Sequence, residues 1–118
     1  MKTNLITLLG FLTFGITGAF AQKESTAKTD SFKIYGNCGM CKTTIESSLS
    51  KKDGVFSKNW DKTSKIMKVT YDSTKTSLQK IGEKIALAGY DNEYATASEA
   101  IYNKLHTCCQ YERPKKDK

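Results

Sequence analysis

The sequence predicts an α+β domain in which an antiparallel sheet carries two helices on one face. Apolar residues alternate in short runs, two other runs have helical spacing, and the runs follow the order strand, helix, strand, strand, helix, strand. The chain has 118 residues, enough for one small domain. With 38% hydrophobic and 26% charged residues, it has the composition of a globular protein and not of a disordered or fibrous one.

Residues 1–21 have the pattern of a secretory signal peptide. A lysine at position 2 precedes an apolar stretch, and Ala19-Phe20-Ala21 has the form of a cleavage site. We therefore expect the mature chain to begin at Gln22 and to be periplasmic. The polar residues 22–30 are expected to form a flexible arm before the folded domain.

The folded part is expected to begin with a short strand around Phe32 and Ile34, which the Gly36-Asn37 pair ends. The apolar period then changes to that of a helix. Three residues four apart fall on one helical face: Cys41, Ile45 and Leu49. The Asp53-Gly54 pair is expected to stop this helix.

A hairpin and a second helix are expected next. Residues 55–60 and 67–71 have the alternation of two strands. The second helix, which Ser73 or Thr74 can cap, also places its apolar residues on one face: Leu78, Ile81, Ile85 and Ala88. Gly89 stands at its end, where a left-handed residue is commonly needed.

Residues 92–96 are expected to supply the last strand. The complete order is that of the ferredoxin-like βαββαβ fold, an open antiparallel sheet with both helices on one face. We therefore assign the domain to residues 31–97. A C-terminal extension with a short helix follows over residues 98–112, and residues 113–118 are expected to be a charged, disordered tail.

Two cysteines are expected in the loop between the first strand and the first helix, within Cys38-Gly39-Met40-Cys41. Cys41 falls in the first helical turn, where unpaired N–H groups and the positive end of the helix favour a thiolate. Two thiolates at this spacing can bind one soft ion, such as Cu(I), Hg(II) or Zn(II). The alternatives are a disulfide between Cys38 and Cys41 and a redox centre, which uses the same spacing.

Five short segments occur in order over about residues 31–96: Cys38-Gly39-Met40-Cys41, Ile45-Glu46, Asp53-Gly54-Val55, Val69-Thr70-Tyr71-Asp72 and Gly89-Tyr90-Asp91. In these segments the chain resembles the heavy-metal-associated domain family, the family of copper chaperones and periplasmic mercury-binding proteins. The resemblance implies that Cys38 and Cys41 bind the metal and that Tyr90 lies beside the ion. We also expect Met40, between the two cysteines, beside the ion. One departure is that Gly36-Asn37 replaces the usual Gly-Met-x before the first cysteine.

Cys108 and Cys109 lie beyond the region of resemblance. Adjacent Cα atoms are about 3.8 Å apart, below the usual disulfide range of about 4.4–6.8 Å, so each cysteine is expected to face a third group. The chain after the last strand is long enough to return to the first cysteine pair. We hypothesise that it supplies one or two further sulfur ligands, with His106 as another candidate ligand. The alternatives are a separate thiol or disulfide role for this pair and a solvent-exposed His106.

Together these features predict a protein that binds Cu(I) or Hg(II), with Zn(II) as a further candidate. It would deliver the ion to a membrane transporter or another metallochaperone, or sequester it. No nucleophile–base pair is evident and the chain has one histidine, so we expect no enzyme. The net charge is +7, but the lysines are spread without an aromatic stacking motif, so no nucleic-acid partner is expected.

We expect a monomer, or a dimer bridged by a metal ion. The spread lysines are expected to form a solvated face that could dock an acidic partner. The competing functions are a thiol-disulfide redox protein and a disulfide-stabilised interaction module. The thioredoxin-like form of the first places a cis-proline beside its cysteine loop, whereas the single proline here is Pro114.

Overall fold

The computed structural model describes residues 26–115. The expected signal peptide and residues 22–25 of the expected arm lie outside this range. Between residues 26 and 115, no helix is both long and apolar enough to cross a membrane.

Three strands form an antiparallel sheet in the order β1-β3-β2: β1 (Ala27–Lys33), β2 (Val55–Trp60) and β3 (Ile66–Asp72). The central strand β3 shows why one face is the core. Met67, Val69 and Tyr71 are buried, whereas Ile66 and Lys68 on the opposite face are exposed. The alternation in the sequence therefore predicted the buried face.

Strand β1 starts earlier than the sequence indicates. The expected arm runs through residue 30, whereas residues 27–30 already pair with residues 69–72 of β3. The hydroxyl of Tyr71 donates to a carboxylate oxygen of Asp30 at 2.9 Å, and the hydroxyls of Thr29 and Thr70 lie 2.9 Å apart. Polar cross-strand pairs thus extend the strand in a segment that lacks an apolar pattern.

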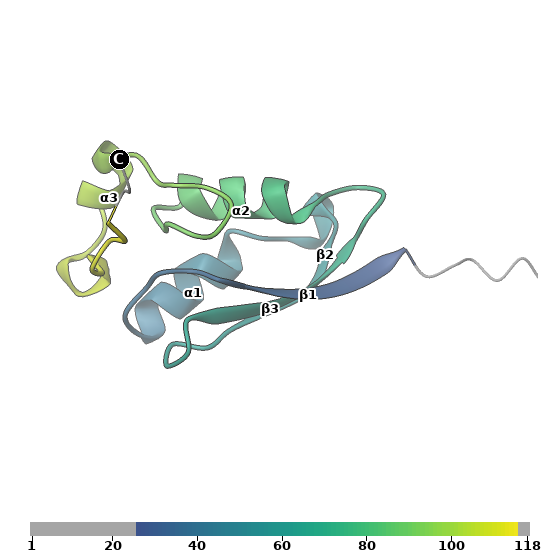
Figure 1. Cartoon of the computed structure of the whole chain (residues 1–118), viewed down its shortest axis with the longest axis horizontal. Coiled ribbons are helices and arrows are strands. Elements are labelled where there is room, and N and C mark those ends of the chain that lie inside the picture. The colour runs from purple at the N-terminus through teal and green to yellow at the C-terminus, as the bar shows by residue number, and fades with distance from the viewer. Residues whose placement is uncertain (1–25, 116–118) are drawn as a thin grey trace, which may run out of the picture.

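Two helices cover the buried face: α1 (Gly39–Ser47) and α2 (Leu78–Leu87) (Figure 1). Ser77, and not Ser73 or Thr74, caps α2, because the Asp72 carboxylate accepts hydrogen bonds from the backbone and hydroxyl of Thr74 and holds a turn there. Helix α1 ends before Asp53, and a 3₁₀ turn, η1 (Lys51–Asp53), leads to Gly54. One apolar cluster joins the sheet to both helices.

The expected last strand, residues 92–96, is reduced to a single bridge between Ile34 and Asn92. The side-chain oxygen of Asn92 accepts the backbone N–H groups of Tyr94 and Ala95 at 3.0 and 3.2 Å. The resulting turn interrupts the regular pairing with β1, because an asparagine side chain can replace backbone pairing locally. The backbone N–H of Glu93 still donates to the Lys33 carbonyl at 3.2 Å. The ferredoxin-like α+β arrangement is confirmed, with a sheet of three strands.

The C-terminal extension forms α3 (Glu99–Asn103), capped by Ser98, and a 3₁₀ turn, η2 (Thr107–Cys109). It lies at the end of the molecule where β1 leads into α1 (Figure 1). The sequence predicts disorder from Arg113 onward, whereas Arg113 is partly buried and ion-paired with Asp91. The ordered extension therefore runs through Arg113.

Candidate metal centre

The first cysteine pair lies where β1 gives way to α1. Cys38 precedes the first helical residue, and Cys41 lies in the first turn, as the sequence predicts. Their Sγ atoms are 3.7 Å apart, and both cysteines are free thiols. Cys41 is fully buried and its sulfur accepts the backbone N–H of Asn37 at 3.4 Å, whereas Cys38 is half-buried. The Cys41 sulfur is thus held inside the protein by a backbone hydrogen bond, whereas the Cys38 sulfur is partly accessible to solvent.

The indole of Trp60 fills the space under this loop. Trp60 is fully buried, and its ring N–H donates to the Ile34 carbonyl at 3.0 Å. A Cβ on Gly36 would lie 2.9 Å from the indole and 3.4 Å from the Cβ of Cys41. The glycine therefore allows the loop to lie against Trp60, at the point where the usual methionine is missing.

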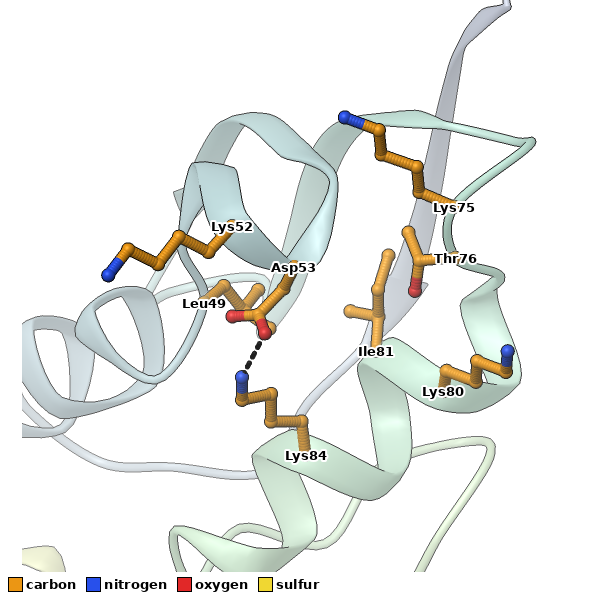
Figure 2. A pocket seen from close by; sticks show the side chains of 8 residues that line it. All are labelled: Leu49, Lys52, Asp53, Lys75, Thr76, Lys80, Ile81 and Lys84. Carbon is orange, nitrogen blue, oxygen red and sulfur yellow. Dashed lines mark ion pairs between the residues drawn. The ribbon is translucent and has the colours of Figure 1, made fainter.

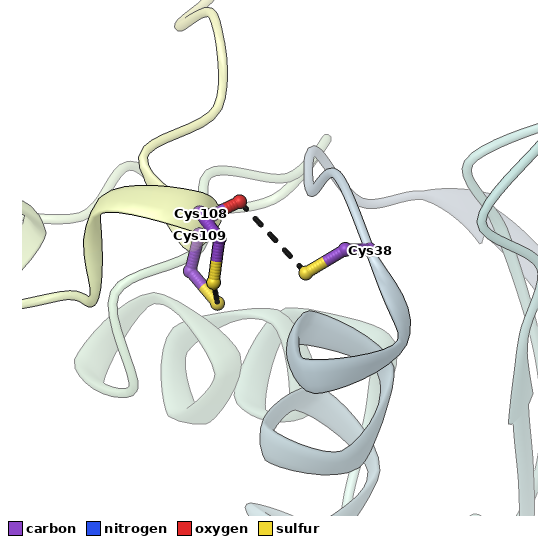
Figure 3. A group of neighbouring side chains, drawn as sticks. All are labelled: Cys38, Cys108 and Cys109. Atoms are coloured by element: carbon purple, nitrogen blue, oxygen red, sulfur yellow. Dashed lines mark hydrogen bonds between the residues drawn. The ribbon is translucent and has the colours of Figure 1, made fainter.

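The C-terminal extension brings the second cysteine pair to the first. The Sγ atoms of Cys38, Cys108 and Cys109 all lie within 4.8 Å of one another. Figure 3 shows the Cys38 sulfur turned from the start of α1 toward the two cysteines of η2. The Cys108 carbonyl accepts the Cys38 thiol at 3.8 Å and the side-chain amide of Asn37 at 3.4 Å. Thiols from both ends of the domain thus gather at one place.

The sulfurs differ in acidity because their surroundings differ. The backbone amide of Cys41, at the positive end of α1, lowers the pKa of Cys38 to about 7. Burial raises the pKa of Cys109 to about 12, and the neighbouring Cys41 thiol adds to the increase. Cys38 therefore forms a thiolate near neutral pH, whereas Cys109 stays protonated there.

Tyr90, in the turn after α2, is fully buried. Burial and the neighbouring Cys41 thiol raise the pKa of its hydroxyl well above the usual value, so it stays protonated. This hydroxyl has no hydrogen-bond partner within residues 26–115. An orphaned donor beside two thiols fits a site in which the sulfurs become anionic on binding a cation.

Met40 and His106 occupy different positions. Met40 is 48% exposed, and its sulfur lies 3.9 Å from the Cys108 sulfur, at the rim of the cluster. His106 is exposed and lies outside the group of mutually close donor atoms. The structure therefore brings Met40 to the thiols and leaves the imidazole of His106 apart from them.

Sequence reasoning missed Tyr111, which is buried although it lies in a polar segment. It also missed the pairing of Arg113 with Asp91. The one available signal was a large aromatic residue between Cys109 and the charged tail, since such a residue needs an apolar partner.

A separate cavity of about 310 Å³ lies between η1 and the start of α2 (Figure 2). Four lysines line it: Lys52, Lys75, Lys80 and Lys84. Lys84 pairs with Asp53 across it. Because Lys75 follows the far end of β3, this cavity lies at the opposite end of the sheet from the cysteines, and none of its lining residues is a soft ligand.

Comparison with known proteins identifies the family. The model of the heavy-metal-associated domain matches residues 37–91. The mercuric transport protein periplasmic component of Shigella flexneri is 31% identical over 81 residues, which cover 68% of this chain and 89% of that protein. The chain belongs to the heavy-metal-associated domain family. The resemblance in the sequence is thereby confirmed, and the family is one of metal-binding domains.

Solved structures of heavy-metal-associated domain proteins confirm the fold. The CopZ metallochaperone is 30% identical, with a TM-score of 0.52, and the match covers 55% of this chain and 98% of that one. Oxidized MerP from Ralstonia metallidurans CH34 is 31% identical, with a TM-score of 0.53, over 57% of this chain and 94% of that one. The family match ends at residue 91, so Cys108 and Cys109 lie outside it.

Proposed function

We propose that this protein binds one soft metal ion between Cys38, Cys41 and the cysteines of the C-terminal extension, and passes it to a membrane transporter from the periplasm. The observation that carries the proposal is the convergence of sulfurs. The Cys38 sulfur lies 3.7 Å from the Cys41 sulfur and within 4.8 Å of the sulfurs of Cys108 and Cys109. The leader pattern and the periplasmic mercuric relative support the location.

The donor set favours Cu(I) or Hg(II). Every close donor is sulfur, and thiolates prefer soft ions. Zn(II) also accepts thiolates and is the third candidate. The named relatives are consistent with this choice, since one is a mercuric transport component and another a putative copper-ion-binding protein from Bacillus anthracis. Here the ion is cargo, and no residue performs catalysis on it.

The exposure of the sulfurs determines from which side an acceptor can reach the bound ion. Cys41 and Cys109 are buried, whereas Cys38 is half-buried and Cys108 is exposed beside Met40. An acceptor thiolate can therefore reach the ion from the outer side. Its sulfur–metal bond forms as the bond to Cys38 or Cys108 breaks, and the electron pair of the broken bond stays on the released sulfur as a thiolate.

The test is a titration of the reduced mature chain with Cu(I), Hg(II) and Zn(II) against calibrated chelators, with the bound sulfurs counted by X-ray absorption. We expect one tightly bound ion with three or four sulfurs. The paired variants Cys38→Ser/Cys41→Ser and Cys108→Ser/Cys109→Ser separate the two halves of the site. The first is expected to abolish tight binding, and the second to leave a two-sulfur site.

Other outcomes would replace the proposal. Full affinity in Cys38→Ser/Cys41→Ser would show that the first pair is not the site. If no ion binds tightly, disulfide reductase activity would favour a redox protein, and a native protein without free thiols would favour a disulfide-stabilised module. An ion-dependent dimer in sedimentation would show that two copies share one ion.

A further inference from the structure

We propose that Arg113 latches the C-terminal extension onto Gly89-Tyr90-Asp91, and that this latch positions Cys108 and Cys109 and sets how fast the bound ion is released. The inference rests on the proposed metal-binding function. It adds positioning residues beyond the segment that the family match covers, because that segment ends at residue 91.

The ion pair between Arg113 and Asp91 is the centre of the latch. Arg113 Nε donates to Asp91 Oδ2 at 2.8 Å and Nη2 donates to Oδ1 at 2.9 Å, in a two-pronged contact. Asp91 is 2% exposed, and it also accepts the backbone N–H of Ala97 at 2.7 Å. Because a buried carboxylate without its cation is strongly unfavourable, the chain end is held firmly.

Tyr111 makes the second contact. Its hydroxyl accepts the backbone N–H of Asp91 and donates to the Gly89 carbonyl, both at 2.8 Å. The hydroxyl of Tyr102, on α3, donates to the Tyr111 carbonyl at 2.5 Å. The two bonds of the Tyr111 hydroxyl satisfy backbone groups of the turn after α2, so withdrawal of Tyr111 would leave these groups without a partner.

Gly89 provides the third contact. Its φ of +110° is in the left-handed region, and a Cβ there would lie 2.8 Å from the side chain of Leu105. The missing side chain therefore makes room for the extension. Gly89 thus makes room for Leu105 and accepts the Tyr111 hydroxyl at its carbonyl. The ring of Tyr90 stacks on that of Tyr111, and Asp91 pairs with Arg113.

Cys109 lies two residues before Tyr111 and is 2% exposed. The same docked segment places its sulfur within 4.8 Å of that of Cys38. Opening the latch would therefore expose Cys109 and withdraw both sulfurs of the extension together. An ion held by three or four sulfurs would then be left with two, which an acceptor thiolate displaces more readily.

The experiment compares the mature chain with Arg113→Gln. The control is Lys115→Gln, which removes the same charge from an exposed position of the same tail. In the ion-free protein, we expect Arg113→Gln to raise the alkylation rate of Cys109 by at least about tenfold and Lys115→Gln to leave that rate unchanged. In the ion-loaded protein, we expect the sulfur count to fall to two and release to a chelator to accelerate by at least about tenfold.

Three results would overturn the latch: an unchanged Cys109 rate, an unchanged sulfur count, or an equal effect from Lys115→Gln. If Arg113→Gln does not fold, Arg113→Lys keeps the charge without the two-pronged contact, and we expect an intermediate Cys109 rate. Wild-type protein that binds no ion would overturn the proposed function. The Cys109 rate in ion-free protein would still decide whether Arg113 holds the extension.

Discussion

The ring of Tyr111 stacks on the ring of Tyr90, with centroids 5.8 Å apart and planes 21° apart. Tyr102 packs edge-on against Tyr111 at 5.1 Å. The innermost ring, Tyr90, has the thiols of Cys41 and Cys109 beside it. One aromatic layer therefore joins the C-terminal extension to the residues that surround the cysteines, and disturbance of the extension should reach the site.

Removal of the Tyr111 hydroxyl should destabilise the fold. Tyr111→Phe keeps the stacked ring but leaves the buried N–H of Asp91 and the carbonyl of Gly89 without this partner. We expect the free energy of unfolding to fall by about 1–3 kcal/mol in urea titrations. Tyr35→Phe, at a half-buried position, is the control and should change stability by less than about 0.5 kcal/mol. Equal losses in both variants would contradict this assignment.

Removal of the Tyr90 hydroxyl should have opposite effects on stability and on ion retention. The hydroxyl is orphaned in the ion-free protein, so Tyr90→Phe should leave the free energy of unfolding unchanged or raise it by up to about 1 kcal/mol. Release of the bound ion should become faster, because the coordinated sulfurs lose a donor. Thermal melts and chelator competition measure the two effects, and a marked loss of ion-free stability would contradict the prediction.

Replacement by alanine should destabilise the protein at Gly36 and not at Gly39. Gly36→Ala places a methyl group 2.9 Å from the rigid, fully buried indole of Trp60, so we expect a loss of about 1–3 kcal/mol and weaker ion binding. Gly39→Ala meets nothing within 4 Å and serves as the control. Urea unfolding and chelator competition on both variants test the role of Trp60, and equal behaviour would argue against it.

The reactivity of the thiols should depend on pH in a residue-specific way. The pKa of Cys38 is lowered to about 7, so its thiolate forms at a lower pH than that of an ordinary cysteine, near about 8.5. Iodoacetamide alkylation of Cys38 in ion-free protein should be half-maximal near pH 7, and Cys109 should stay protected. In urea the Cys38 midpoint should rise toward about 8.5. The same midpoint in folded and unfolded protein would contradict the lowered pKa.

Much of the fold could be predicted from the sequence because its signals are local. Alternation located the buried residues of β3, helical spacing located Ile45 and Ile85, and Gly89 has the left-handed conformation expected at the end of α2. The errors fell where polar side chains outweigh the apolar pattern. Asn92 closes a turn in place of a strand.

In the candidate site, too, the local features could be predicted from the sequence and the long-range contacts could not. The spacing of Cys38 and Cys41 at a strand–helix junction indicated a two-sulfur site, and the structure places them there. The approach of Cys108 and Cys109 was a hypothesis from chain length alone. No local pattern indicated what would hold them, because Arg113 and Asp91 lie 22 residues apart in the sequence.

The sequence by itself determined the fold class, the strand–helix junction that carries Cys38 and Cys41, and the resemblance to a metal-binding family, because periodicity, helix ends and motif spacing are properties of neighbouring residues. Only the tertiary structure decided that Cys108 and Cys109 lie beside Cys38, that Trp60 lies under the loop and that Arg113 pairs with Asp91. These features depend on contacts between distant segments, and their geometry follows from packing around the common core.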